Sequence, residues 1–383
     1  MFKKFLVAVI SGLLCLYLIL FPAGESWAVQ VEPPSTPPEI SAEAAVILDW
    51  NSGRLLYAKN PHLPRPMAST TKIMTALVAL EKGTLKDVVI ISAQAAHTGG
   101  SSIWLEEGEK KTLEELLLGL MLRSGNDAAV AIAEHIAGSV EAFAQLMTAR
   151  ARELGARKTV FKNPHGLHHP EHYTTARDLA CIAAHAMGMR EFRRIIATPK
   201  ALISWPGQPW DRFLYNQNKL FELYAGAEGI KTGWTTPAGR CFVGAAQNCN
   251  RRLITVVFNA PQMWEDTTLL LDYGFTEFNY KKVINKGQHL KSAAVSRGDD
   301  KKVKVIAADS FYYPLKDAKE EKKVTYKFII DEPLKAPLRN KERIGELEIC
   351  FGREVVGVVD LLAGQEVKKT GLWRRLQKIL RRE

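Results

Sequence analysis

The hydrophobic and polar positions of this chain change their spacing along its length. Residues 44–57 form two short apolar runs on either side of Asn51-Ser52-Gly53, which predicts a β-hairpin. Residues 73–80 then form an apolar run that ends at Gly83, as expected of a helix. Further helical patterns cover the middle of the chain, over residues 112–122, 127–137 and 139–154.

Strand patterns return in the second half of the chain. Residues 229–235 read as a short strand, and residues 240–247 and 252–260 as the next two strands of an antiparallel sheet. A helical pattern follows over residues 263–274. A hairpin, then helices, then strands and a final helix predict an α+β fold, with helices packed on an antiparallel sheet.

The pattern changes again from about residue 278. Short β-type runs separated by charged turns replace the helical spacing, and no helix signal lies between them. The clearest runs are residues 303–306, 324–330, 347–351 and 355–359. We expect a second, small all-β domain here, over residues 278–364, with no chemistry of its own.

The N-terminus resembles an export signal. Lys3 and Lys4 precede an apolar run over residues 5–21, and Ser26-Trp27-Ala28 offers small residues at the positions that a signal peptidase reads. The expected boundaries are a cleaved signal over residues 1–28, a proline-rich linker over residues 29–41 and an α+β domain over residues 42–277. An uncleaved membrane anchor is the alternative interpretation of residues 5–21.

The last segment, residues 365–383, has an amphipathic pattern. At helical spacing its apolar side chains occupy one arc and its arginines and lysines the opposite arc. A basic amphipathic helix with a tryptophan is typical of an interfacial membrane anchor. A helix packed on the protein itself is the alternative. The apolar arc consists of Leu372, Trp373, Leu376, Ile379 and Leu380.

Composition adds charge and thiols to this picture. The chain of 383 residues carries a formal net charge of +11, which suits an anionic membrane or wall polymer as well as nucleic acid. No nucleic-acid motif accompanies the charge. Four cysteines follow the expected signal, and Cys241 and Cys249 flank a predicted turn. One disulfide between them and ordinary thiols are both open, since a core of this size needs no crosslink.

Candidate chemistry begins at Ser69-Thr-Thr-Lys72, at the start of the first helical pattern. Residues three apart share one helix face, so Ser69 at or near the N-cap and Lys72 would project together. The free N–H groups of a first turn favour a developing anion. The pattern indicates a serine nucleophile beside a lysine. Alone it is also typical of an ordinary helix start with a solvated lysine.

Two further motifs follow in order. Ser124-Gly125-Asn126 interrupts two apolar helices, as a loop that points side chains into a cleft would. Lys231-Thr232-Gly233 lies on a predicted strand. With Ser69-x-x-Lys72 they match the motif set of penicillin-binding proteins and serine β-lactamases. The joint match favours an active site over three chance occurrences.

Residues 163–172 hold four histidines and a glutamate. A metal site is one hypothesis, but His168, His169, Glu171 and His172 lie in a proline-bounded loop without helical spacing. We expect the loop to shape the rim of the cleft instead.

The whole of residues 42–383 resembles the low-molecular-mass penicillin-binding proteins of the D-alanyl-D-alanine carboxypeptidase family. Besides the three motifs, the stretches 163–167 and 271–275 are similar to family sequences, and so is the order of signal, catalytic domain, β domain and amphipathic tail. The resemblance implies a penicillin-recognising domain that removes the last D-alanine from a peptidoglycan stem pentapeptide. It implies no metal or organic cofactor.

The resemblance also implies roles in catalysis. Ser69 corresponds to the acylated nucleophile and Lys72 to its general base. Ser124 corresponds to the residue that relays a proton to the leaving amine. The backbone N–H groups of Ser69 and Trp234 would form the oxyanion hole.

The implied substrate-binding residues are Asn126 and the Lys231–Trp234 strand. Asn126 corresponds to the residue that binds the substrate amide, and Lys231 and Thr232, with Gly233 beside them, to the binders of the terminal carboxylate. Some relatives have an arginine before the last helix for this carboxylate, and the matching place near Met263 has none. Arg240 is the candidate substitute.

Three other functions share part of this evidence. A β-lactamase has the same motifs but needs a base that hydrolyses the acyl-enzyme quickly. A catalytically silent wall-binding protein would not need Ser69, Lys72 and Lys231, and a structural scaffold would need no motif. The expected location is the outer face of the bacterial cytoplasmic membrane, with stem peptide, β-lactams and anionic lipid as partners.

Overall fold

The computed structural model describes residues 36–331 and 333–371. The expected signal and most of the amphipathic tail therefore lie outside the described residues. Among the helices that the structure describes, none is long and apolar enough to cross a membrane.

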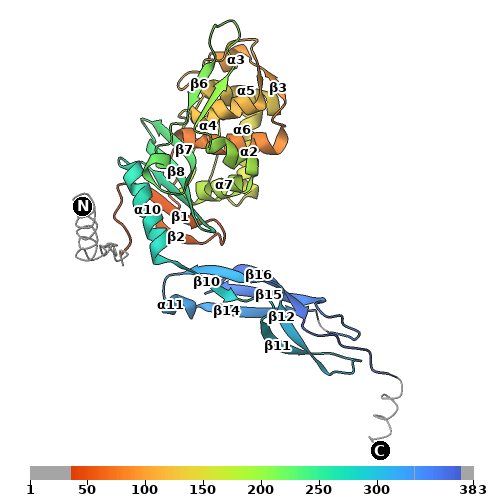
Figure 1. Cartoon of the computed structure of the whole chain (residues 1–383). Helices are drawn as coiled ribbons and strands as arrows, with labels where there is room; N and C mark the ends of the chain where they lie inside the picture. The colour runs from red at the N-terminus through yellow and green to blue at the C-terminus, as the bar shows by residue number, and fades with distance from the viewer. Residues whose placement is uncertain (1–35, 332, 372–383) are drawn as a thin grey trace, which may run out of the picture. The chain divides into compact units, whose positions relative to one another are not determined.

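A five-stranded antiparallel sheet forms the centre of the first domain (Figure 1). Its order is β2-β1-β9-β8-β7, so the N-terminal hairpin pairs with strands about 200 residues later. The expected α+β class is confirmed. The strands are β1 (Ala44–Asp49), β2 (Leu55–Lys59), β7 (Ala227–Thr235), β8 (Gly239–Asn248) and β9 (Arg251–Phe258).

Helices cover both faces of this sheet. Alternate residues of β9 belong to two different cores, with Ile254 and Val256 in one and Leu253 and Val257 in the other. The larger core lies under the main group of helices, and α10 covers the smaller one (Figure 1). The helices are α2 (Lys72–Lys82), α4 (Leu113–Leu122), α5 (Asn126–Ala137), α6 (Val140–Glu153), α7 (Ala176–Gly188), α8 (Arg190–Ile196) and α10 (Met263–Glu277).

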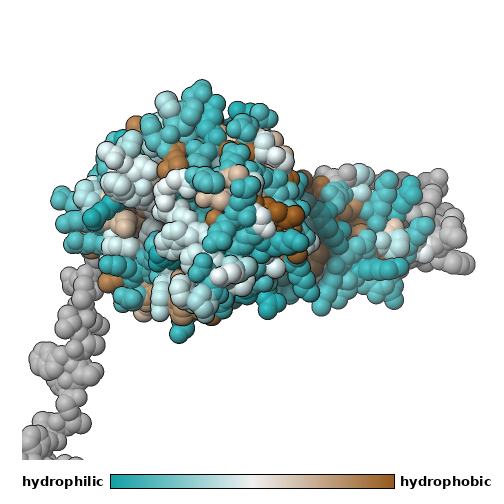
Figure 2. Space-filling model, turned by 90° about the horizontal axis from the view of Figure 1, so that it is seen from above, coloured by the Kyte–Doolittle hydropathy of each residue, from teal (hydrophilic) through white to brown (hydrophobic). Residues whose placement is uncertain are grey.

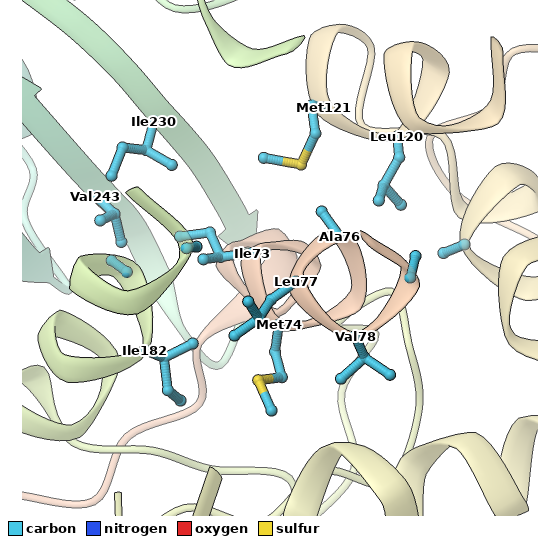
Figure 3. Close-up of a cluster of buried hydrophobic side chains, with 14 of the residues drawn as sticks. Ile73, Met74, Ala76, Leu77, Val78, Leu120, Met121, Ile182, Ile230 and Val243 are labelled. Atoms are coloured by element: carbon cyan, nitrogen blue, oxygen red, sulfur yellow. The ribbon is translucent and has the colours of Figure 1, made fainter. Parts of the chain in front are cut away.

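Helix α2 lies in the middle of the larger core. Apolar side chains surround it on several sides, with Leu120 and Met121 from α4, Ile182 from α7 and Ile230 from β7 (Figure 3). All but its last turn is buried, which is why residues 73–80 read as a continuous apolar run instead of an amphipathic one. The helix therefore gives a rigid base to whatever its first turn carries.

The start of α2 differs from the expectation that Ser69 caps it. Residues Ala68–Thr71 form a 3-10 turn (η1), α2 begins at Lys72, and the N-cap, Thr71, makes no side-chain capping bond. Ser69 therefore lies inside a tight turn. The predicted end at Gly83 is correct. Helix α4 begins with a capping box, in which Thr112 and Glu115 bond reciprocally.

Two small sheets were not predicted. They are formed by β3 (Val88–Ile90) with β4 (Lys110–Thr112), and by β5 (Lys200–Ile203) with β6 (Arg212–Tyr215). Each strand has three or four residues, which is too short for an alternating pattern to register. Two single-turn helices, α3 (Ala93–Ala96) and α9 (Leu220–Leu223), complete this domain.

The second domain is all-β apart from one turn of helix, α11 (Ala318–Glu321), which was not expected. Its five-stranded sheet has the order β11-β12-β16-β15-β14, and β10 pairs with β13. Val367 is buried in its core, and Thr370 N–H donates to Arg297 O, so the domain continues past residue 364. The strands are β10 (Asn279–Ile284), β11 (His289–Ala294), β12 (Lys302–Ala307), β13 (Phe311–Leu315), β14 (Val324–Ile330), β15 (Arg343–Phe351) and β16 (Glu354–Ala363).

Candidate active site

The structure brings Ser69 and Lys72 into contact. Lys72 Nζ lies 3.0 Å from Ser69 Oγ, and Lys72 is fully buried. The residue before the serine, Ala68, has φ 46°, a left-handed conformation that an alanine rarely adopts. This strained turn replaces the expected helix cap and still puts the two side chains together.

The Lys72 amine has three neighbours in hydrogen-bond reach. Besides Ser69 Oγ they are Asn126 Oδ1 and the His165 carbonyl, each at 2.7 Å. The carbonyl can only accept. The Asn126 amide is oriented by its Nδ2, which donates to Gly99 O at 2.7 Å, so its Oδ1 also accepts. When Lys72 is neutral, these two bonds use both of its N–H groups, and its lone pair faces the serine hydroxyl.

Ser124 and Asn126 come from the junction of α4 and α5, and Asn126 is the first residue of α5. Ser124 has φ 63°, and its buried Oγ has no hydrogen-bond partner in the described structure. A buried hydroxyl without a partner, on a strained backbone, is typical of a functional group. Lys72 thus contacts both Ser69 and the second motif.

Strand β7 forms the other side of the site. Lys231 is almost fully buried and Trp234 is exposed. A Cβ added to Gly233 would lie 2.9 Å from Ser69 N and 3.1 Å from Ala68 Cβ. The backbone of the third motif therefore packs directly against the 3-10 turn Ala68–Thr71, which we call the serine turn. Any side chain at residue 233 would push β7 and the serine turn apart.

Burial shifts the titration of both lysines. The pKa of Lys72 lies well below its ordinary value because the amine is desolvated, and because Lys231 repels its charge. Desolvation lowers the pKa of Lys231 to about 7. Both pKa values therefore lie below the ordinary value of a lysine, that of Lys72 through burial and then repulsion, and that of Lys231 through burial.

The histidine-rich loop, residues 163–172, contacts the serine turn through the His172 side chain. The His172 ring is buried between Thr71 Oγ1, 2.8 Å from Nε2, and the Lys162 N–H, 3.0 Å from Nδ1. Its pKa is lowered to about 3, chiefly by burial, so the ring is neutral near pH 7. No group of three or more metal-ligating side chains is assembled anywhere in residues 36–331 and 333–371. The loop contacts the site through the His172 ring and through the His165 carbonyl, which accepts from Lys72 Nζ.

Sequence reasoning missed Asp127, which directly follows the second motif. Its buried carboxylate accepts from the N–H groups of Ile103 and Leu105 and from Ser102 Oγ. Asn126 N–H meanwhile donates to Ser101 O at 2.7 Å. Asn126 and Asp127 thus join residues 101–105 to the start of α5 by hydrogen bonds. The available signal was a charged residue next to Ser124-Gly125-Asn126, directly before the apolar run of residues 128–133.

The side chains of Arg240 and the cysteines make no hydrogen bond or ion pair with these site residues in the described part of the chain. Arg240 is exposed on β8, opposite Trp234 in the strand register, and its Nη1 donates to Pro261 O at 3.1 Å. Its role stays a prediction. Cys181, Cys241, Cys249 and Cys350 are all unpaired in the structure, which agrees with the thiol interpretation.

Comparisons with known proteins agree with this geometry. Residues 30–262 match the D-alanyl-D-alanine carboxypeptidase family, and residues 278–369 match the C-terminal domain of penicillin-binding protein 5. The D-alanyl-D-alanine carboxypeptidase DacF of Bacillus subtilis is 34% identical over 340 residues, which is 86% of this chain and 87% of DacF. DacA of Haemophilus influenzae is 30% identical and covers 94% of each chain.

Solved structures give the same result. Penicillin-binding protein 5 from Haemophilus influenzae superposes with a TM-score of 0.70 at 30% identity, over 87% of this chain and 99% of that one. PBP3 from Streptococcus pneumoniae reaches a TM-score of 0.73 at 26% identity, over 86% of this chain and all of that one. With its fold, its serine–lysine cluster and both domain matches, this chain belongs to the D-alanyl-D-alanine carboxypeptidase family of serine hydrolases of cell-wall metabolism.

Proposed function

We propose that this enzyme removes the terminal D-alanine from peptidoglycan stem pentapeptides through an acyl-enzyme on Ser69. The observation that carries the proposal is the set of contacts of Lys72. Two of its three neighbours are obligatory acceptors, so the neutral amine can take a proton only from Ser69 Oγ.

Acylation then follows from the position of each group. Ser69 Oγ attacks the carbonyl of the penultimate D-alanine while its proton passes to Lys72 Nζ. The developing oxyanion is bound by the backbone N–H groups of Ser69 and Trp234, which the close packing of Gly233 on the serine turn supports. The C–N bond breaks, and D-alanine leaves after a proton reaches its amine through Ser124.

Substrate binding uses the groups around this centre. Asn126 binds the peptide amide, and Lys231, with Thr232 and Gly233, binds the terminal carboxylate. Lys231 Nζ has only a weak contact with Thr232 O, at 3.2 Å, among the described residues, so it is available for an anion. Arg240 would add a second cation from β8. Water finally hydrolyses the ester and regenerates the Ser69 hydroxyl.

A β-lactamase is the second candidate, because it would share every step up to the acyl-enzyme. A class A β-lactamase activates water with a glutamate between the second and third motifs. Glu171 lies in that interval, but it is exposed and pairs with Lys162 at 2.8 Å. Without such a base we expect the bulky penicilloyl ester to persist.

Mass spectrometry with benzylpenicillin and a turnover assay separate these two functions. We expect a long-lived adduct of one penicillin on Ser69, together with many turnovers of a peptide that ends in D-Ala-D-Ala. Glu171→Gln should change neither result. Rapid hydrolysis of penicillin without turnover of the peptide would make the protein a β-lactamase.

We further propose that the enzyme is exported and works at the outer face of the cytoplasmic membrane. The signal-like residues 1–28 and the basic amphipathic residues 371–383 support this location. Penicillins act on the same face, so covalent inhibition by β-lactams is part of the proposal.

A further inference from the structure

The small sheet of β5 and β6 presents aromatic side chains to solvent. Leu202 lies opposite Phe213 in its register, and Tyr215 follows two residues later on the same face. With Trp210 in the connecting turn, these side chains are 47–62% exposed, and the rings of Phe213 and Tyr215 stack with centroids 4.6 Å apart. We call Leu202, Trp210, Phe213 and Tyr215 the aromatic hairpin.

The opposite face of the hairpin is fixed by buried charges. Arg212 binds Glu109 through two hydrogen bonds of 2.6 and 2.8 Å, and Lys111 Nζ lies 3.0 Å from the same carboxylate. Lys111 also donates to Ser204 O at 2.6 Å. Paired, desolvated charges of this kind hold one geometry, because breaking any pair would leave an uncompensated buried charge. The aromatic face is therefore held in place by a rigid support.

The same support extends to Trp104. Arg212 Nη2 donates to Trp104 O at 2.6 Å. Trp104 has φ 57° and is 60% exposed, although both of its neighbours are buried and bonded to Asp127. A bulky residue in this conformation costs about 1–3 kcal/mol and persists only where its surroundings impose it. The ring is thus held out in solvent next to the second motif.

Both attachments of the hairpin lead to the candidate active site. Trp104 lies three residues after Ser101, whose carbonyl binds Asn126 N–H. On the other side Gln217 N–H donates to Leu122 O at 3.3 Å, two residues before Ser124. The aromatic hairpin and Trp104 are therefore attached, through residues 217 and 101–104, to the segments on either side of Ser124. Large exposed apolar groups that gather in one place mark an interaction site. The face of the molecule in Figure 2 is mainly hydrophilic, with separate apolar areas.

We propose that the aromatic hairpin and Trp104 bind the sugar chain of the polymeric substrate while its stem peptide enters the active site. This inference rests on the proposed function. Sugar rings carry apolar C–H faces that stack on aromatic rings, and they need no compensating charge. The hairpin offers Lys200 and Asp211 beside its apolar residues and so has no cationic cluster for an anionic lipid.

A second copy of the chain fits this surface less well. A stable dimer buries about 800 Å² on each partner. A fully buried aromatic side chain contributes about 150–250 Å², and the side chains of the aromatic hairpin and of Trp104 are already about half covered. A narrow, rigid, uncharged strip suits a single polymer strand better.

The test compares substrates of increasing size in the full mature enzyme. D-alanine release is measured from a soluble pentapeptide, from a monomeric disaccharide pentapeptide and from intact glycan strands. The proteins compared are wild type, the triple variant Trp210→Ala/Phe213→Ala/Tyr215→Ala and the single variant Trp104→Ala. We follow the ratio of kcat/KM on glycan strands to kcat/KM on the soluble peptide, which we call the polymer ratio. In both variants we expect the polymer ratio to fall by about fivefold or more, mainly through a higher KM on the strands. Co-sedimentation with insoluble peptidoglycan should fall in parallel.

The matched control is Val88→Ala/Ile90→Ala, which truncates exposed apolar side chains on the other small sheet and should leave the ratio unchanged. An unchanged ratio in the hairpin variants, or an equal loss on all three substrates, would overturn the inference. So would loss of binding to anionic vesicles, or loss of a dimer in light scattering, with the polymer ratio intact. If wild type does not turn over even the soluble peptide, the proposed function itself fails.

Discussion

Lys72 and Lys231 are two buried amines in one site, and in the proposed mechanism their titration decides when Ser69 can react. Lys72 must be neutral to accept a proton, so acylation is expected to rise with pH as Lys72 loses its charge. Its pKa is lowered by burial first and by Lys231 second. Removing the charge of Lys231 should raise the pKa of Lys72, so the acid limb of the rate profile should move to higher pH.

Stopped-flow acylation by a penicillin across pH tests this coupling in wild type and Lys231→Ala. The control is Lys82→Ala, which removes an exposed lysine at the other end of α2 and should leave the midpoint where it is. The shift is expected below about pH 7, where Lys231 itself carries a charge. A profile whose midpoint is the same in wild type and Lys231→Ala would contradict the coupling.

The nucleophile and the base are tested by substitution. Ser69→Ala should abolish covalent labelling by penicillin, since no hydroxyl remains to form the ester. Lys72→Ala should slow labelling by about 10²–10⁴-fold, the usual contribution of a general base. Intact-mass spectrometry with peptide mapping gives the readout, and Ser139→Ala, at the cap of α6, is the control. Labelling of any serine other than Ser69 would show that the assignment is wrong.

At the scale of elements, the site depends on how closely the histidine-rich loop approaches the serine turn. Gly166 has φ +90°, and a Cβ there would lie 1.9 Å from Ala68 O. The loop also accepts a hydrogen bond from Thr75 Oγ1 at Pro164 O, at 2.6 Å. These contacts hold the His165 carbonyl against Lys72, so the loop and α2 act as one unit.

Gly166→Ala is expected to move the histidine-rich loop away from the serine turn at the start of α2. The left-handed backbone alone costs an alanine about 1 kcal/mol, and the clash with the Ala68 carbonyl adds to it. Gly155→Ala is a matched control, because Gly155 has φ +83° with nothing within 4 Å of its Cβ position. Urea unfolding should show a clearly larger loss of stability for Gly166→Ala, together with slower acylation. Equal losses in the two variants would mean that the close approach is unimportant.

At the scale of the whole molecule, the β domain ends close to the amphipathic segment. Residues 367–370 pair with Leu338 and Gly298, so a deletion from residue 367 would remove part of the β-domain core. A deletion of residues 371–383 leaves that pairing complete. It isolates the contribution of the basic amphipathic sequence to attachment.

We expect the variant lacking residues 371–383 to be released as soluble, active enzyme. A single amphipathic helix binds a membrane reversibly, through apolar area and attraction to anionic lipid. Cell fractionation followed by penicillin labelling of each fraction measures the release, with the full-length chain as the reference. If the shortened protein stays in the membrane fraction, residues 5–21 are the true anchor and the signal is not cleaved.

The sequence by itself determined the fold class, the three motifs and the order of most of the long elements. Long, buried elements such as α2 and β9 leave an unmistakable apolar pattern, because their burial is continuous along the chain. The motifs were also readable, since the residue types of Ser69, Lys72 and Lys231 and their order can be read directly from the chain. The short strands β5 and β6 were missed because four residues carry too little periodicity.

Only the tertiary structure decided how these parts act together. The 3-10 turn at Ser69 is in close contact with Gly233 and Gly166, which belong to elements far away in the sequence. The same holds for Asp127, whose partners lie more than 20 residues before it. Hydrogen bonds and close contacts between distant segments are properties of packing, and no local pattern records them.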